Sequence, residues 1–143
     1  MIVLAAVLMG AGICAPPQPM TAAVSVVASS SVHVGDLSQL VVKVTNTGPA
    51  IPHLGLVFRT SDHWYERHEM KDLAGCVVVV ESSGFDCGDL AVSDSRTLSF
   101  SGLASVAGTF HYELALRELV QPFDWVNDHA DGADAQTWDE TVS

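Results

Sequence analysis

The sequence predicts an all-β fold, an immunoglobulin-like antiparallel β-sandwich of about seven strands. Short runs of alternating apolar residues recur between turn residues, at the spacing typical of a sandwich. No long window has a helical period, and only 64–73 offers a short helical alternative. Hydrophobic residues make up 48% of the 143 residues, which is enough to form the core of one domain.

The expected strands lie at regular intervals along the chain. They cover residues 22–28, 40–44, 54–58, 77–80, 97–101, 109–117 and 135–142. The period of two is clearest in 109–117, where Phe110, Tyr112, Leu114 and Leu116 should form the inner face. This row is therefore the predicted centre of the core.

Turn residues and β-branched residues support these assignments. Gly35 and Asp36 predict a turn, and the run 46–49, Asn-Thr-Gly-Pro, should end the strand before it. Four consecutive valines at 77–80 favour a buried strand. The segment 61–72 is expected to be a solvated loop or an edge strand.

Residues 1–21 are predicted to be a signal peptide and a Pro-rich spacer, followed by one domain at 22–143. The apolar run 2–13 is too short to cross a bilayer as a helix, so no membrane span is expected in the mature chain. A positive region before it is missing, and a buried first strand or a short anchor are the alternatives. Cleavage could fall near Ala15 or after 21–23, and Cys14 raises the question of lipid attachment although Ile13 fits that poorly.

Two cysteines, Cys76 and Cys87, remain if the signal is removed. An even pair in an exported chain predicts one disulfide, and two free thiols are the alternative. Loop entropy alone would make this disulfide worth about 3 kcal/mol. The prediction places the protein outside the cytoplasm, secreted or at the cell surface.

The charge of the chain narrows the classes of partner. Six Lys and Arg stand against seventeen Asp and Glu, which gives a net charge of −11. Such a surface repels phosphate backbones, so no nucleic-acid partner is expected. Anionic membranes are disfavoured for the same reason, whereas divalent cations and cationic partners remain open.

Three stretches between 34 and 119 carry motifs in a defined order. VGDLSQLVVKVTNTGP begins at Val34 and holds the G-D turn and the N-T-G strand end. CVVVVESSGFDCGDL begins at Cys76 and places the second cysteine before G-D-L. SRTLSFSGLASVAGTFHYELAL begins at Ser95 and holds R-T-L and A-G-T, the latter leading into the long strand.

In this order the motifs resemble a conserved repeat domain of bacterial surface proteins, catalogued as a domain of unknown function. That family is immunoglobulin-like and adhesion-related, and the resemblance covers about two thirds of the chain. It implies a spacer or adhesive module and brings no catalytic residues. The sequence departs from the family at 93–95, which lacks the usual Gly, in the acidic stretch 127–134, and in the His-rich segment 61–72.

The segment 61–72, SDHWYERHEMKD, is the first candidate site. Its aromatic and imidazole side chains, His63, Trp64, Tyr65 and His68, predict a binding surface, because aromatic residues anchor interfaces. With Glu66 and Glu69, the two histidines could also bind zinc or copper. However, the histidines are five residues apart, which suits neither one face of a helix nor one face of a strand.

The second candidate site is an acidic segment without Lys or Arg. Its predicted ligands for Ca²⁺ are Asp124, Asp128, Asp131 and Asp134, with Asn127 nearby. The spacing is not that of an EF-hand loop, and a solvated acidic loop is the alternative. No other cofactor is expected.

No catalytic constellation can be recognised, since there is no G-x-S-x-G motif and the cysteines are assigned to a disulfide. We therefore expect a non-catalytic exported or cell-surface module with a structural or adhesive role, acting on an unknown protein or cell-surface partner. The alternative is an exported metal- or small-ligand-binding protein that uses the His-rich and acidic loops.

Overall fold

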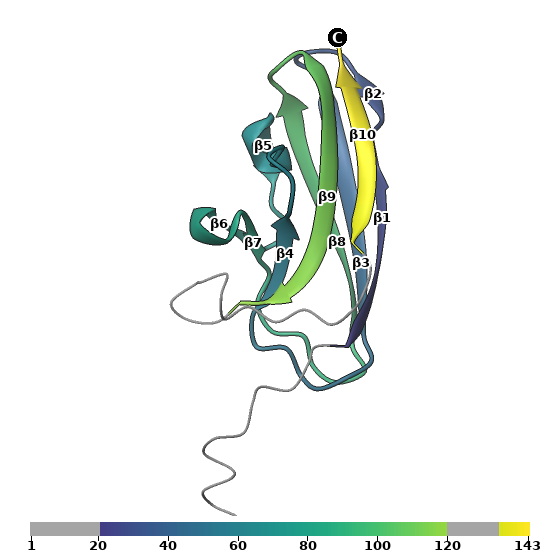
Figure 1. Ribbon diagram of the computed structural model, residues 1–143, viewed down its shortest axis with the longest axis vertical. Helices are drawn as coiled ribbons and strands as arrows, with labels where there is room; N and C mark the ends of the chain where they lie inside the picture. Colours follow the sequence, from purple (N-terminus) through teal and green to yellow (C-terminus); the bar gives the residue numbers. More distant parts are fainter. Residues whose placement is uncertain (1–20, 120–134) are drawn as a thin grey trace, which may run out of the picture.

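The structure is a computed structural model, and it describes residues 21–119 and 135–143. Ten strands and two 3-10 turns follow one another along the chain (Figure 1). They are β1 (Ala22–Ala28), β2 (Ser31–Val32), β3 (Leu37–Asn46), β4 (Leu54–Phe58), η1 (Trp64–Glu66), β5 (His68–Asp72), β6 (Val77–Val79), η2 (Val80–Ser82), β7 (Gly84–Asp86), β8 (Ser95–Ala104), β9 (Gly108–Glu118) and β10 (Gln136–Val142).

The strands form two sheets that face each other as a sandwich, which confirms the predicted fold class. The first sheet has the order β1-β3-β8-β5, and the second has the order β2-β10-β9-β4-β7-β6. Every pair of neighbouring strands is antiparallel except β2 and β10, which run parallel. The seven expected strands are all present, and the structure adds β2, β5 and β7.

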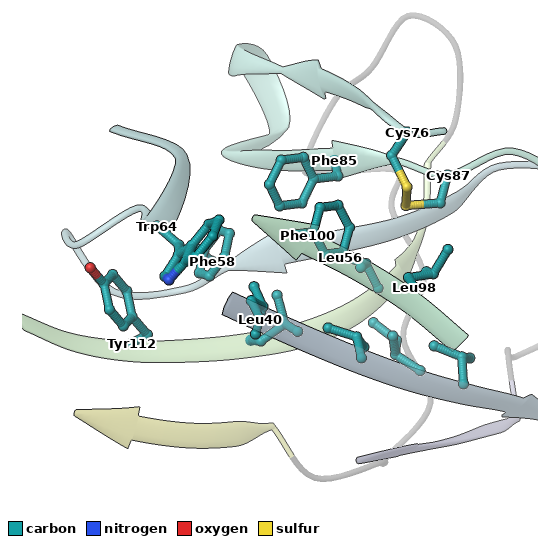
Figure 2. Close-up of a cluster of buried hydrophobic side chains, with 14 of the residues drawn as sticks. Leu40, Leu56, Phe58, Trp64, Cys76, Phe85, Cys87, Leu98, Phe100 and Tyr112 are labelled. Atoms are coloured by element: carbon teal, nitrogen blue, oxygen red, sulfur yellow. A yellow bond between two sulfur atoms is a disulfide. The ribbon is translucent and has the colours of Figure 1, made fainter. Parts of the chain in front are cut away.

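The core lies between the sheets, and the long strands β3, β8 and β9 contribute mainly alternate residues to it. The predicted row on β9 is confirmed, because all four of its side chains are buried: Phe110, Tyr112, Leu114 and Leu116. On the opposite sheet, Leu40 of β3 and Phe100 of β8 face the same core (Figure 2). Phe85 of β7 joins the two sides, with its ring centroid 4.5 Å from that of Phe100.

The valine run at 77–80 does not form the buried strand that its composition predicts. Val77 is 58% exposed and Val80 is 68% exposed. The reason is topological, since β6 is a three-residue strand at the outer edge of the second sheet. After Val79 the chain turns through η2 and reaches a left-handed conformation at Ser83 (φ 56°).

The short helix considered for 64–73 is absent from the described chain. Only the single 3-10 turn η1 forms there, and β5 follows it as an edge strand of the first sheet. This agrees with the edge-strand prediction for 61–72. A bulge between Met70 and Asp72 interrupts the pairing of β5 with β8.

Strand β4 is buried on both faces, because all five of its residues are buried. Val57 is fully buried, as are its neighbours Leu56 and Phe58, and it lies opposite Ala115 of β9. Gly55 is needed here because a Cβ at this position would lie 2.6 Å from Cγ of Leu119. Leu119, which follows β9, thus covers β4 at Gly55.

Two predictions fall outside the described residues, namely the signal peptide with its spacer and the acidic segment of Asp124 to Asp134. Within the described ranges, neither 3-10 turn is long or apolar enough to cross a membrane, and no longer helix occurs.

Candidate functional site

The disulfide predicted between Cys76 and Cys87 is present. Cys76 immediately precedes β6 and Cys87 immediately follows β7, so the bond closes the open end of this hairpin. Their Cα atoms are 4.2 Å apart, and both residues are buried. The bond ties the two strands of the outer hairpin of the second sheet to each other.

Reducing this disulfide is expected to lower the free energy of unfolding by about 3 kcal/mol, because the unfolded chain regains the entropy of an open loop. Urea unfolding with and without reductant measures the difference. The Cys76→Ala, Cys87→Ala double variant serves as control, since reductant should leave its midpoint unchanged. Equal midpoints for oxidised and reduced wild type would contradict the expectation.

The four residues of the predicted binding surface do not share one surface. His63 and Tyr65 are partly exposed and stack with ring centroids 5.6 Å apart. Trp64 and His68 are buried, and their rings stack at 4.1 Å in the core. The prediction is therefore wrong for Trp64 and His68, because Trp64 at the start of η1 and His68 at the start of β5 both face the core.

The metal ligands considered in 61–72 are likewise separated. His63 pairs with Glu66 at 3.1 Å, whereas Glu69 pairs with Lys71 at 2.9 Å. His68 points away from both pairs into the core. Among residues 21–119 and 135–143, no three His, Cys, Asp or Glu side chains are close enough to hold a metal ion.

The predicted Ca²⁺ ligands Asp124, Asp128, Asp131 and Asp134 lie outside the described residues. Their arrangement therefore stays a prediction.

A buried polar network, which the sequence analysis missed, surrounds Glu140 of β10. Glu140 is fully buried, and the hydroxyl of Ser38 on β3 donates to its Oε2. His68 on β5 places Nε2 2.9 Å from Oε1, which is an ion-pair distance. The hydroxyl of Tyr112 on β9 donates to the same oxygen at 3.4 Å.

The network connects both sheets at one end of the core. Ser38 and His68 belong to the first sheet, whereas Tyr112 and Glu140 belong to the second. His68 is held in place by its Nδ1, which is 2.7 Å from the carbonyl oxygen of Trp64. Trp64 and Tyr112 lie at one end of the buried cluster, and the disulfide lies at the other (Figure 2).

One sequence signal could have revealed Glu140. In the run Thr-Trp-Asp-Glu-Thr-Val, the period of two places Glu140 on the same face as Trp138 and Val142. An acidic residue on an inner face is a buried polar group that requires hydrogen-bond donors. The sequence does not say which distant residues supply them.

Ser38, His68 and Glu140 have the composition of a nucleophilic triad but not its arrangement. In such a triad the imidazole lies between the hydroxyl and the carboxylate, so that it can take the proton of the nucleophile. Here the carboxylate lies between the hydroxyl and the imidazole. All three residues are also buried. The network links β10 to β3, β5 and β9.

Burial raises the pKa of Tyr112 far above its usual value, and the negative charge of Glu140 and Asp62 adds to this. Arg67 opposes the shift. The pKa of Tyr65 is also raised, first by burial and then by the charge of Glu66. Both phenols are therefore held in the neutral form when the protein is folded.

This difference predicts a loss of stability in alkali. The unfolded chain releases phenolic protons above pH of about 10, whereas the folded chain retains them. The contribution of the two phenols to stability is therefore fully present below that pH and is lost as pH rises above it. Phenolate absorbance should appear together with the loss of tertiary circular dichroism, and phenolate formed in the folded protein near pH 10 would contradict the assignment.

Comparisons with known proteins support the fold and no more. No family model and no curated protein matches the chain. A crystal structure of a CARDB domain from Pyrococcus furiosus, described as a complex with di-metal ions, is 14% identical, with a TM-score of 0.52 over 90% of this chain and 92% of that chain. A solution NMR structure of the same domain is 15% identical, with a TM-score of 0.55 over 88% and 97%.

Proposed function

We propose that the chain is a non-catalytic, exported or cell-surface immunoglobulin-like module with a structural or adhesive role. The observation that carries the proposal is the bond between Cys76 and Cys87 in a two-sheet sandwich, since structural disulfides persist in oxidising compartments. The resemblance to bacterial surface repeats supports the same assignment. Ser38, His68 and Glu140, which meet in the core, are buried. Their burial also favours a non-catalytic role.

The parallel pairing of β2 with β10 supports a structural role. The backbone N–H of Ser143 donates to the carbonyl oxygen of Val32 at 3.0 Å, and the backbone N–H of Val34 donates to that of Ser143 at 2.9 Å. The backbone N–H of Thr141 donates to the carbonyl oxygen of Ser30 at 2.9 Å. Tension that pulls β2 and β10 in opposite directions along their axes loads these bonds together rather than one by one. A module joined to others at its two ends would resist such a pull.

The outer face of the first sheet supports an adhesive role. It is rich in small hydroxyl side chains on two adjacent strands: Thr45 of β3, and Ser95, Thr97, Ser99 and Ser101 of β8. Lys43 is the single charged residue that β3 places there. This surface offers hydrogen bonds without the acidic charge of the rest of the chain.

Labelling of intact cells tests the location. A membrane-impermeant amine reagent should modify exposed Lys43 on cells that produce the chain, while a cytoplasmic protein of the same cells stays unlabelled. Labelling that requires lysis would contradict an exported or surface-attached position. Loss of attachment or of envelope integrity on deletion of the chain then separates the adhesive role from the structural one.

The alternative proposal is a metal-binding exported protein that uses the acidic segment. It is supported by the structural neighbour described with di-metal ions and by the density of Asp between 124 and 134. Like charges held on one folded segment repel one another, and a divalent cation would remove that repulsion. Extracellular modules bind Ca²⁺ at about 10⁻⁴ to 10⁻³ M with partial ligand sets.

We expect millimolar Ca²⁺ to raise stability by about 1–3 kcal/mol through mass action if the segment binds it. Thermal melts should show a larger shift with Ca²⁺ than with Mg²⁺ at equal ionic strength. The Asp128→Asn, Asp131→Asn double variant should remove the difference. Small, equal shifts with both ions would mean general screening and would exclude a Ca²⁺ site.

A further inference from the structure

Strand β1 is the unprotected edge of the first sheet. Within the described part of the chain it pairs only with β3, and it runs along the margin of the molecule (Figure 1). Its sequence, Ala-Ala-Val-Ser-Val-Val-Ala, has seven residues with no charge and no proline. Such an edge is a template for pairing with another strand.

The other edges carry features that oppose pairing. β5 presents Glu69, Lys71 and Asp72, and a bulge interrupts it. β6 has three residues and β2 has two, which is too short for a stable ladder. Charge, bulges and short length are the usual protections of a sheet edge, and β1 has none of them.

The hydrogen bonds to β3 show which backbone groups of β1 face the open edge. Ser29 donates to the carbonyl of Gln39, and Thr47 donates to the carbonyl of Thr21. Because hydrogen-bonded and non-hydrogen-bonded pairs alternate in an antiparallel ladder, odd-numbered residues of β1 bond to β3. The even-numbered residues turn N–H and C=O outward: Ala22, Val24, Val26 and Ala28.

Charge directs two copies of the chain toward this edge. The chain has a net charge of −11, so copies repel each other over most of their surface. Strands β1 and β3 contain no Asp or Glu, and Lys43 is their single charged residue. Two acidic copies can therefore approach each other at the β1 edge, because β1 and β3 bring no negative charges together there.

We propose that two copies of this chain associate by antiparallel pairing of their β1 strands about a two-fold axis at Ser25. In this register each outward-facing even residue meets another, since Val24 lies opposite Val26 of the second copy and Ala22 lies opposite its Ala28. Ser25 lies opposite itself in a non-hydrogen-bonded pair, where side chains are closest. Ala23 lies opposite Val27, which is 73% exposed in the single chain.

The strand is nearly the same when read in either direction about Ser25, which makes the pairing self-complementary. Val24 meets Val26 and Ala22 meets Ala28, Ala23 meets the larger Val27, and the two serine hydroxyls can bond to each other. The two first sheets then form one continuous eight-stranded sheet, because each contributes four strands. The inference does not depend on where the protein is located.

Sedimentation velocity tests the pairing with matched variants in a Cys14→Ser background. A single edge pair is a small interface, so the dimer should form between about 1 µM and 1 mM. Ser25→Lys places two like charges opposite each other and should abolish the dimer. Ser99→Lys adds the same charge on exposed β8 and should leave the dimer intact.

Val26→Pro removes an outward N–H without removing a hydrogen bond to β3, so it should also give a folded monomer. Ser25→Cys should cross-link copies on mild oxidation, because Cα atoms in such pairs are about 4.5 Å apart. Ser99→Cys should not. A wild-type chain that stays monomeric up to about 1 mM, or equal effects of Ser25→Lys and Ser99→Lys, would overturn the proposal. If the chain stays monomeric, the β1 edge would be open to pairing with a strand of another protein.

Discussion

Replacing Glu140 with alanine is expected to lower the free energy of unfolding by about 3–5 kcal/mol. The carboxylate is fully buried, and it contacts Ser38 and His68 across the two sheets. Its removal leaves the imidazole and the hydroxyl of Ser38 buried without their partner. The cost of an unpaired buried group is larger than the net gain from the intact pair.

Urea unfolding measures this effect, and the neighbouring acid provides the control. Asp139→Ala removes a carboxylate from the same strand, but Asp139 is 66% exposed at its side chain and pairs with exposed His111. It should change stability little. The His68→Leu, Glu140→Leu double variant should recover much of the loss, because apolar side chains leave no charge unpaired. Equal effects of Glu140→Ala and Asp139→Ala would contradict the buried network.

Truncating Leu114 to alanine is expected to cost about 2–5 kcal/mol. Leu114 lies in the fully buried row of β9 and faces the core between the two sheets. The substitution removes apolar contacts and leaves a cavity that a packed sandwich cannot close. Denaturant unfolding with an unchanged m-value would show that the loss is in stability rather than in compactness.

His111 provides the matched position on the same strand. It faces outward, and its Nδ1 is 2.5 Å from Oδ1 of Asp139 in an exposed pair. His111→Ala should therefore have little effect. If the His111 variant were less stable than the Leu114 variant, the register of β9 would be shifted by one residue.

The parts of the fold that could be predicted are those where neighbouring residues decide the structure. Alternation placed the β9 row inward, and Asn46 ended β3 at the expected turn. There the side chain of Asn46 donates to the carbonyl of Pro49 at 2.9 Å and accepts from the N–H of Gly48. The local turn chemistry of Asn and Gly thus gave the right boundary.

The parts that could not be predicted depend on which strands become neighbours. The valines of β6 favour a strand, but only the sheet order places that strand at an edge. Trp64 and His68 read as surface residues because their segment is polar, yet Trp64 at the start of η1 and His68 at the start of β5 are both buried in the core. The partners of Glu140 come from β3, β5 and β9, which are far from it in sequence.

We propose that this is an exported module whose disulfide forms outside the reducing cytoplasm. The most direct test begins by quenching producing cells with acid and separating their compartments. Free thiols are then blocked under denaturing conditions, and the Cys76 and Cys87 peptides are identified by mass spectrometry. We expect the chain in the extracytoplasmic fraction with both cysteines unmodified until reductant is added. A chain found in the cytoplasmic fraction, with both cysteines blocked as free thiols, would contradict the claim.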